Sequence, residues 1–484
     1  MGLPRTVGVV IAVVAVTACS SAATPIDQAV PAVDLTWAGD PYYPGSGNPG
    51  YDVTRYDIAI DYRVDSEVMQ GLTSVAARAT KPLDRIPLDL GATVRRVWLD
   101  GAPATFEQKG TTLVVHPAPA LVAGQDFTVR VSYRGRGTRM AGEGGGWITT
   151  DDGAVTAGEP KVATAWFPSN DHPSDKASYD VTVTTDEGLE VVGNGDLISH
   201  KTARDSTTWH WREMSPMATY LAFVAIGDFT LERSVSDDGI PSLIALSDEL
   251  GAERRALARG LRLTPDIVDS LADYLGPYPF ASTGGVAVDI PFSALETQTR
   301  PIYTSRVFGN IRSAWNRELL VVHELAHQWF GDSVTVRTWK DIWLNEGFAT
   351  WSEWLYAEQE AGIDANRAFT RVYRWQKRYP RQTWTWDVPP GDPGRRYIFD
   401  WAVYQRGALA VQALRNIVGD DTFQQIVRTW LSTRVYGNGS DQEFLAHAEQ
   451  VSGRSLQKWF DVWLMAPHRP AETKENGFPP QLLD

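Results

Sequence analysis

The 484-residue sequence contains a single cysteine, Cys19. One cysteine excludes a disulfide framework and every metal or iron–sulfur site built from several cysteines. Positive charge is also scarce, because 45 lysines and arginines stand against 59 aspartates and glutamates, a formal net charge of -14. A protein that coats nucleic acid needs the opposite balance, so we exclude that class and expect no nucleic-acid partner.

The hydrophobic run at the N-terminus, residues 6–18, is too short to span the roughly 30 Å hydrocarbon core of a membrane. It follows one positive charge, Arg5, and is typical of an export signal peptide, which we place at residues 1–18. The single cysteine comes directly after Val16-Thr17-Ala18, and this pattern resembles a bacterial lipobox. The resemblance implies a lipoprotein anchored through Cys19 to the outer face of the cytoplasmic membrane or cell envelope. The alternative is an ordinary signal peptide with a chance cysteine nearby.

The rest of the composition is that of a folded protein, with 43% hydrophobic and 21% charged residues. The length predicts two or three domains. Residues 19–50 are rich in Ala, Pro, Gly, Ser and Asp, and we assign them to a tether that follows the lipid anchor. From residue 51 to about 240, runs that alternate apolar and polar residues predict a largely antiparallel β domain. The runs lie at 56–62, 112–116, 127–133, 179–184 and 220–226.

Helical periodicity dominates residues 241–470, which we assign to a second, mainly α-helical domain. Only one strand, 285–290, is expected there. The predicted helices cover 252–275, 313–331, 341–362, 400–417, 421–433 and 454–464. Residues 471–484 are assigned to a tail. The fold class predicted from these patterns is therefore a multidomain α+β protein with its β domain first.

A candidate metal site begins at His323-Glu324-Leu325-Ala326-His327. His323 and His327 are four residues apart on a predicted helix, so both imidazoles lie on one face and can share a zinc ion. Glu324 points about 100° away around the helix, where it can act on a water at the metal without being a ligand.

A third ligand is available in Asn345-Glu346-Gly347, which starts eighteen residues after His327. Glu346 lies among apolar residues, where an unpaired carboxylate is costly to bury. Two histidines and one glutamate leave a fourth position open, as catalytic zinc sites do, and we expect one zinc ion per chain. Replacement by another metal stays open. Glu353, two turns farther along the helix, is either a plain surface carboxylate or a residue that orients a ligand.

These residues resemble the zinc signature of the aminopeptidase N family of gluzincin metallopeptidases: His-Glu-x-x-His, eighteen residues, then Asn-Glu-Gly. The similarity extends from about Tyr51 to Leu464 and includes the segments 166–173 and 276–280. It implies a saddle-shaped β domain followed by a thermolysin-like catalytic domain. Many members continue as a helical C-terminal domain. We expect a short member without that domain, and therefore a more open cleft.

The same resemblance implies three further parts of the site. Ala294, Leu295 and Glu296 align with the family's Gly-x-Met-Glu-Asn loop, and Glu159 aligns with the glutamate of its Gln-x-Glu segment. Both glutamates are expected to bind the ammonium group of a substrate. Tyr404 aligns with the tyrosine of Tyr-x-Lys-Gly-Ala, which donates to the oxyanion. Several loop residues differ from the family pattern, so the preferred substrate side chain stays open.

Together these residues predict a zinc-dependent aminopeptidase, in which Glu324 is the general base and the substrates are peptides with a free N-terminus. Three alternatives remain. A zinc endopeptidase would need no ammonium-binding glutamates. An epoxide hydrolase on the same scaffold is favoured by no feature of the sequence. A non-catalytic, surface peptide-binding lipoprotein would be expected to have lost the base or a ligand.

Overall fold

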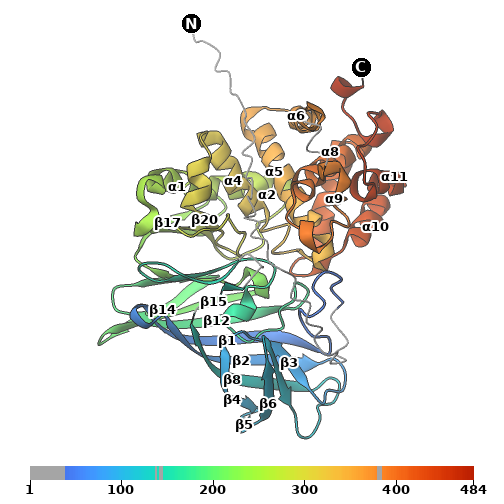
Figure 1. Cartoon of the computed structure of the whole chain (residues 1–484). Coiled ribbons are helices and arrows are strands. Elements are labelled where there is room, and N and C mark those ends of the chain that lie inside the picture. Colours follow the sequence, from blue (N-terminus) through green and yellow to red (C-terminus); the bar gives the residue numbers. More distant parts are fainter. Residues whose placement is uncertain (1–38, 137–138, 141–144, 379–383, 484) are drawn as a thin grey trace.

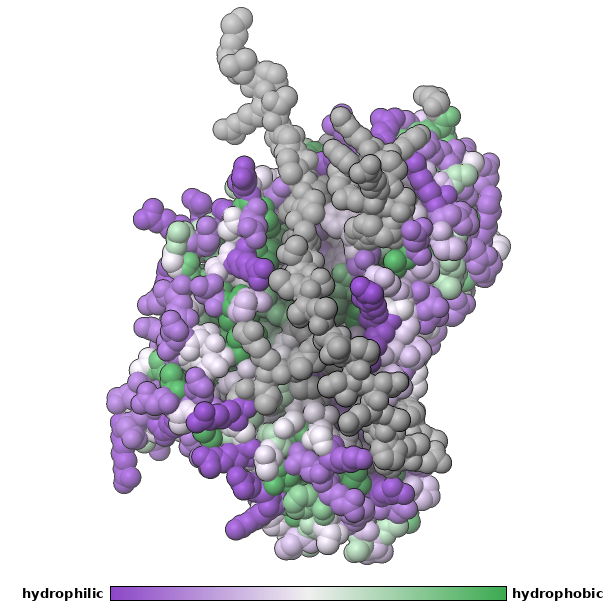
Figure 2. Space-filling model, viewed as in Figure 1, coloured by the Kyte–Doolittle hydropathy of each residue, from purple (hydrophilic) through white to green (hydrophobic). Residues whose placement is uncertain are grey.

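The computed structural model describes residues 39–136, 139–140, 145–378 and 384–483. The predicted signal peptide and Cys19 lie outside these described residues. A β-rich half occupies one end of the molecule and a mainly helical half the other (Figure 1). Hydrophilic residues dominate the surface in the same view, with hydrophobic residues scattered among them (Figure 2). Among the described residues, no helix is both long and apolar enough to cross a membrane.

The β-rich half is organised by an eight-stranded sheet. In spatial order its strands are β14 (Asp196–Ala203), β15 (Ser206–Ala218), β12 (Lys176–Asp186), β1 (Tyr51–Arg63), β2 (Val68–Ala79), β8 (Asp126–Arg136), β4 (Thr93–Leu99) and β5 (Ala102–Pro103). Side chains of β1 alternate between buried and more exposed positions, as the sequence pattern predicts. The pairing is antiparallel throughout except between β1 and β12, which run parallel.

Two smaller sheets complete this half. One contains β13 (Glu190–Gly193), β16 (Val224–Gly227), β11 (Ala154–Ala157), β10 (Gly145–Thr149) and β9 (Arg139–Met140), and the other β3 (Ile86–Asp89), β7 (Thr112–His116) and β6 (Thr105–Lys109). The strand predicted at 220–226 starts later, because Thr219–Leu221 form a 3₁₀ turn. Tyr220 in this turn donates a hydrogen bond from its hydroxyl to the carbonyl of Gly331, and so contacts the helical half.

The first part of the helical half forms a four-stranded sheet. Its strands are β17 (Phe229–Val235), β18 (Pro241–Ser247), β19 (Thr283–Val288) and β20 (Ile302–Thr304). β17 pairs with β18, so this sheet starts before the boundary that the sequence analysis placed at residues 240 and 241. A two-stranded sheet joins β21 (Thr335–Val336) to β22 (Asn438–Gly439).

Helices form most of the rest of this half, and the first three of them contact the four-stranded sheet. The helices are α1 (Arg254–Leu261), α2 (Thr264–Leu275), α3 (Ser305–Asn310), α4 (Ala314–Ala326), α5 (Trp343–Ala361), α6 (Ala365–Arg378), α7 (Trp384–Asp387), α8 (Gly407–Val418), α9 (Asp420–Thr433), α10 (Asp441–Ser452) and α11 (Gln457–Phe460). The prediction missed α3, α6, α7 and α10, and the expectation of a single strand after residue 240 was wrong, because β18, β20, β21 and β22 accompany β19. The two longer of these helices had a signal: α6 buries Phe369 and Val372 at helical spacing, and α10 starts with a capping box of Ser440 and Glu443.

The described parts of the assigned tether and tail are packed, not free. Asp40 accepts hydrogen bonds from the backbone N–H groups of Tyr42 and Tyr43, and from that of Trp339 in the helical half. Ser46 donates to the carbonyl of Asp171 in the β-rich half. At the other end of the chain, Phe478 is 3% exposed in the helical core. Residues 39–50 therefore link the two halves.

Candidate metal and substrate site

The two histidines of the site are oriented by partners behind them. Helix α4 carries His323, and His327 follows directly at the end of the helix. The Nδ1 atom of His323 lies 3.0 Å from a carboxylate oxygen of Glu353, and the Nδ1 atom of His327 lies 3.0 Å from the carbonyl oxygen of Phe330. These contacts direct each Nε2 atom toward the site. Of the two interpretations of Glu353, the structure supports the one in which it orients His323.

Glu346 brings the third candidate ligand from the first turn of α5. Its Oε2 atom lies 3.2 Å from Nε2 of His323 and 3.3 Å from Nε2 of His327. One ligand atom from each of the three residues falls within 4.8 Å of the others, and all three side chains are buried. The predicted ligands are therefore brought together in a geometry that can hold one metal ion.

Two glycines set the position of Tyr404 relative to Glu346. Helix α5 crosses α8 at Gly347 and Gly407, where a Cβ atom on Gly407 would lie 2.9 Å from the Cα of Gly347. Only glycine at both positions allows the backbones to approach this closely. Tyr404 lies one turn before Gly407, and its ring stacks on that of His323 with a centroid distance of 5.9 Å.

The turn that holds Tyr404 is a π-helical turn, Ala402–Arg406, directly before α8. Such turns are rare and frequent at functional sites. Arg406 is 0% exposed and donates hydrogen bonds to five backbone carbonyls, those of Trp386, Val388, Val462, Trp463 and Ala466. Among the described residues it has no carboxylate partner, and burial lowers its pKa to about 9. Arg406 therefore fixes this turn to the C-terminal segment.

The candidate ligands shift one another's pKa values. The pKa of Glu346 is lowered to about 2 despite burial, because His327 and His323 attract its carboxylate. Conversely, nearby carboxylates, led by Glu296 and Glu346, overcome burial and raise the pKa of His327 to about 9. Each group thus stabilises the charged form of its neighbour.

The site also contains carboxylate groups that pair with no lysine or arginine of the described chain. Glu159, Glu296 and Glu324 are at most 9% exposed, and in the described chain none forms a salt bridge with a lysine or arginine. Burial of several carboxylates without a counter-ion is costly. A divalent cation on two imidazoles and one carboxylate would offset that cost, and this donor set is the one expected for zinc. The residues present therefore fit zinc.

Glu324 is placed to act as a base. A carboxylate oxygen of Glu324, one of Glu296 and a ring nitrogen of His327 lie within 4.8 Å of one another. Burial raises the pKa of Glu324 to about 8, although the two neighbouring histidines oppose the shift. A bound dication would favour the ionised carboxylate, which is the form that accepts a proton.

Glu159 and Glu296 meet at the side of the metal ligands. Their carboxylates, together with that of Glu346, offer oxygens within 4.8 Å of one another. One oxygen of Glu159 and one of Glu296 are buried without a hydrogen-bond partner among the described residues. Buried acceptors of this kind are uncommon in folded proteins. Two unpaired carboxylate oxygens next to the metal ligands match a binding site for a cationic group.

The loop that carries Glu296 is tied both to the sheet and to the histidine segment. Leu295 pairs with Ile302 through two backbone hydrogen bonds of 2.9 and 2.8 Å, and Ala294 before it is 9% exposed. Gln328 donates from its side-chain amide to the carbonyl of Glu296, and accepts from the backbone N–H of Thr299 at 2.8 Å. Gln328 therefore sets the distance between this loop and His327.

Tyr404 keeps its proton in this environment. Burial raises the pKa of its phenol well above the ordinary value, and Glu346, Glu159 and Glu296 add to the shift. A protonated phenol beside the metal ligands can donate a hydrogen bond to a developing oxyanion. The position agrees with the role that the sequence resemblance implied.

Two residues that position these groups, Gln328 and Arg406, were not predicted from the sequence. Gln328 follows the second histidine directly, so its place next to the site could have been expected from helical geometry, whereas its partners on the distant loop could not. Arg406 is two residues from Tyr404, but nothing in a single sequence signals that it is buried against five carbonyls.

Family models identify the chain. The peptidase M1 N-terminal domain matches residues 53–221, and the peptidase family M1 domain matches residues 264–463. The chain belongs to peptidase family M1. The two matches cover the β-rich half and the helical half in the order that the structure shows, and the second contains all three candidate metal ligands.

Curated M1 relatives match most of this chain over about half of their own length. Aminopeptidase M1-D of Oryza sativa subsp. japonica is 25% identical over 463 residues, and a probable aminopeptidase 1 of Sulfurisphaera tokodaii is 24% identical over 446 residues. The matches include 88% and 87% of this chain, which spans about half the length of these curated relatives, 50% and 54%.

A solved two-domain structure matches more completely. The M1 zinc metallopeptidase from Deinococcus radiodurans is 28% identical, with a TM-score of 0.79 over 90% of this chain and 99% of that chain. A mutant of that protein bound to a Tyr-Ser-Ala substrate matches with 27% identity and the same TM-score. The two-domain architecture of this chain is therefore that of a known M1 metallopeptidase.

Proposed function

We propose that this protein is a zinc-dependent aminopeptidase that removes N-terminal residues from peptides. The observation that carries the proposal is the pair of unpaired carboxylate oxygens on Glu159 and Glu296, beside a complete set of zinc ligands. A substrate ammonium group would satisfy both oxygens through charge-assisted hydrogen bonds. An enzyme that cuts within peptides needs no such pair.

Each group of the site has a separate role in the proposed reaction. When bound, zinc acidifies a water molecule and polarises the scissile carbonyl. Glu324 accepts the proton of the attacking water and later delivers it to the leaving amine. Tyr404 donates its phenolic proton in a hydrogen bond to the oxyanion that develops on the carbonyl. Glu159 and Glu296 hold the ammonium group, which places the first peptide bond of the substrate over the base.

The test compares one peptide in two forms, with a free and with an acetylated N-terminus, in the presence and absence of a chelator. We expect stepwise loss of N-terminal residues from the free form only, abolished by the chelator and restored by zinc, with the products identified by mass spectrometry. Internal cleavage of both forms would support an endopeptidase instead. Cleavage of neither form would leave an epoxide hydrolase or a peptide-binding protein.

We also propose that the protein is exported and anchored to the membrane through a lipid on Cys19. The support is the sequence: an apolar run after one positive charge, ended by the only cysteine of the chain. Metabolic labelling with a radioactive fatty acid should mark the wild-type protein and not a Cys19→Ala variant. Equal labelling of the two would contradict the proposal, as would absence of label from both.

A further inference from the structure

Five exposed arginines project from two neighbouring strands of the large sheet, β4 and β8. Three of them lie on β8: Arg130, Arg134 and Arg136. Together with Ser132, they occupy every second position of this part of the strand. Because the alternating residues Val129, Val131 and Tyr133 of β8 are buried, these side chains point away from the core. Arg95 and Arg96 lie on β4, with Arg96 directly opposite Ser132. We call these five residues the arginine face.

None of these arginines has a partner in the described part of the chain: no salt bridge or side-chain hydrogen bond involves any of them. By contrast, an arginine at the far end of β8 is paired: Arg78 on the neighbouring strand β2 lies 2.7 Å from Asp126 on β8. An acidic protein with a net charge of -14 has ample carboxylates to pair its arginines. The five arginines of the arginine face nevertheless have no ion-pair partner among the described residues. A cluster of unpaired positive charges is what a surface for an anionic partner requires.

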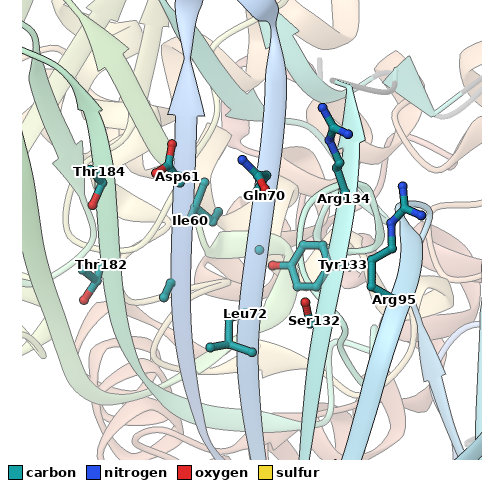
Figure 3. Close-up of a pocket in the computed structure, with 12 residues that line it drawn as sticks. Ile60, Asp61, Gln70, Leu72, Arg95, Ser132, Tyr133, Arg134, Thr182 and Thr184 are labelled. Atoms are coloured by element: carbon teal, nitrogen blue, oxygen red, sulfur yellow. The ribbon is translucent and has the colours of Figure 1, made fainter. Parts of the chain in front are cut away.

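A pocket of about 390 Å³ adjoins the arginine face. It is lined by Arg95 and Arg134, and by polar side chains of neighbouring strands that include Gln70, Ser132 and Thr182 (Figure 3). Asp61 also lines the pocket and lies 3.4 Å from Arg63. The pocket therefore combines two unpaired guanidinium groups and one carboxylate with hydroxyl and amide groups.

We propose that the arginine face docks on an anionic phospholipid surface, and that the pocket receives the phosphate and polyol of one headgroup. The proposal rests on the membrane anchoring proposed above. Guanidinium groups bind phosphate oxygens in a bidentate geometry, and hydroxyl and amide side chains hydrogen-bond to polyol hydroxyls. Basic residues close to an anionic leaflet are attracted to it, and the attraction grows with their number.

Two further observations favour a membrane over an acidic peptide. Trp98 lies on β4 directly opposite Arg130 and is half-buried, so an aromatic ring accompanies the arginines, as at membrane–water interfaces. The strands β4 and β8 also lie at the end of the molecule far from the helices (Figure 1). Docking there would hold the metal site away from the lipid and open to peptides.

The test measures how the full chain partitions into vesicles of phosphatidylcholine alone and of phosphatidylcholine with phosphatidylglycerol. The anchor contributes to both partition constants, so their ratio isolates the headgroup charge. We expect a ratio of at least about ten at low salt, which falls toward one at high salt. Replacing all five residues of the arginine face with glutamine should bring the ratio close to one.

A matched control removes the same amount of charge elsewhere. Arg255, Arg259, Arg306, Arg312 and Arg367 are exposed arginines of the helical half, and none has an ion pair in the described chain. Their replacement with glutamine should leave the ratio as in the wild type. Equal ratios for the two variants would overturn the proposal, because net charge and not the arginine face would then control binding.

Modification of arginines by phenylglyoxal, mapped by mass spectrometry, locates the contact. Anionic vesicles should protect the arginine face and not the control arginines. Protection by a soluble acidic peptide but not by vesicles would overturn the proposal in favour of a peptide partner. Loss of partition into phosphatidylcholine vesicles after Cys19→Ala would support the anchor, and partition unchanged by that substitution would contradict the anchor alone. A ratio near one for the anchored wild type would contradict the arginine face alone.

Discussion

Two groups of buried aspartates and glutamates show how differently the same chemical group is used. Within the β-rich half, Asp171 accepts hydrogen bonds from the backbone N–H and hydroxyl of Thr164 and from the hydroxyl of Thr219. Asp40 accepts three from backbone N–H groups. In the metal site, by contrast, Glu159 and Glu296 each keep one oxygen without a partner.

The difference separates structural from functional carboxylates. Burial is comparable, since Asp171 is 1% and Glu296 is 4% exposed. What differs is the supply of donors from the chain itself. A buried carboxylate that the fold satisfies stabilises the folded state, whereas one left unsatisfied costs free energy until a ligand arrives. Around the metal ligands, zinc and a substrate ammonium can offset that cost.

The largest effect is expected from Glu324, because the proposed reaction depends on proton transfer. A Glu324→Gln variant should lose about 10²–10⁴ in kcat, the usual contribution of a general base. Zinc content and thermal midpoint should stay at wild-type values, since glutamine keeps the volume and Glu324 is not a ligand. His323→Ala is the comparison, and it should lose the metal as well. Full activity of Glu324→Gln would remove it from the mechanism.

A smaller loss is expected when one of the unsatisfied carboxylates is neutralised. Glu296→Gln should lower kcat/KM for free peptides by about tenfold to a hundredfold, as a charge-assisted hydrogen bond to the ammonium is weakened. Glu213→Gln is the matched control, because Glu213 is 5% exposed but accepts a hydrogen bond from the backbone N–H of Ser215. It should lower the thermal midpoint and leave kcat/KM unchanged. A lower kcat/KM for Glu213→Gln, with no change for Glu296→Gln, would contradict the distinction between satisfied and unsatisfied carboxylates.

The metal ligands could be predicted from the sequence because their geometry is local. His323 and His327 are one helical turn apart, and Glu346 starts the next long helix, so spacing alone indicates their chemistry. The β domain was also predictable, since alternating burial follows from strand geometry. The family resemblance supplied Glu159, Glu296 and Tyr404, which come from three separate segments and have no common spacing.

What the sequence could not show depends on contacts between distant segments. The strand predicted at 220–226 is shortened because Tyr220 contacts Gly331, over a hundred positions away. The predicted helix at 313–331 ends at Ala326, where the chain turns so that the carbonyl of Phe330 reaches His327. The assigned tether packs from residue 39 onward through Asp40. At Tyr220 and Asp40, hydrogen bonds between distant segments override the local pattern, whereas the contact that follows Ala326 joins residues three positions apart.

A moderate effect is expected from Arg406, which acts on Tyr404 only through the backbone. Arg406→Met keeps much of the volume and removes all five hydrogen bonds to carbonyls. We expect kcat to fall about tenfold with KM little changed, because a small displacement of the oxyanion donor affects the transition state more than substrate binding. Arg406→Lys should recover only part of the loss, since an ammonium cannot reach five carbonyls in a planar arrangement. A fall in thermal midpoint with normal kcat would make Arg406 purely structural.

The smallest change in activity is expected from the satisfied carboxylates. Asp40→Asn leaves one oxygen for three backbone N–H donors and should cost about 1–2 kcal/mol of stability, read from the denaturation midpoint. Values of kcat and KM should not change, because no ligand uses Asp40. Yet Asp40 joins residues 39–43 to Trp339 in the helical half. If kcat fell together with the midpoint, the orientation of the two halves would depend on this contact. The distance from Glu159 to Glu296 would then depend on it as well, and a structural carboxylate would also serve the site.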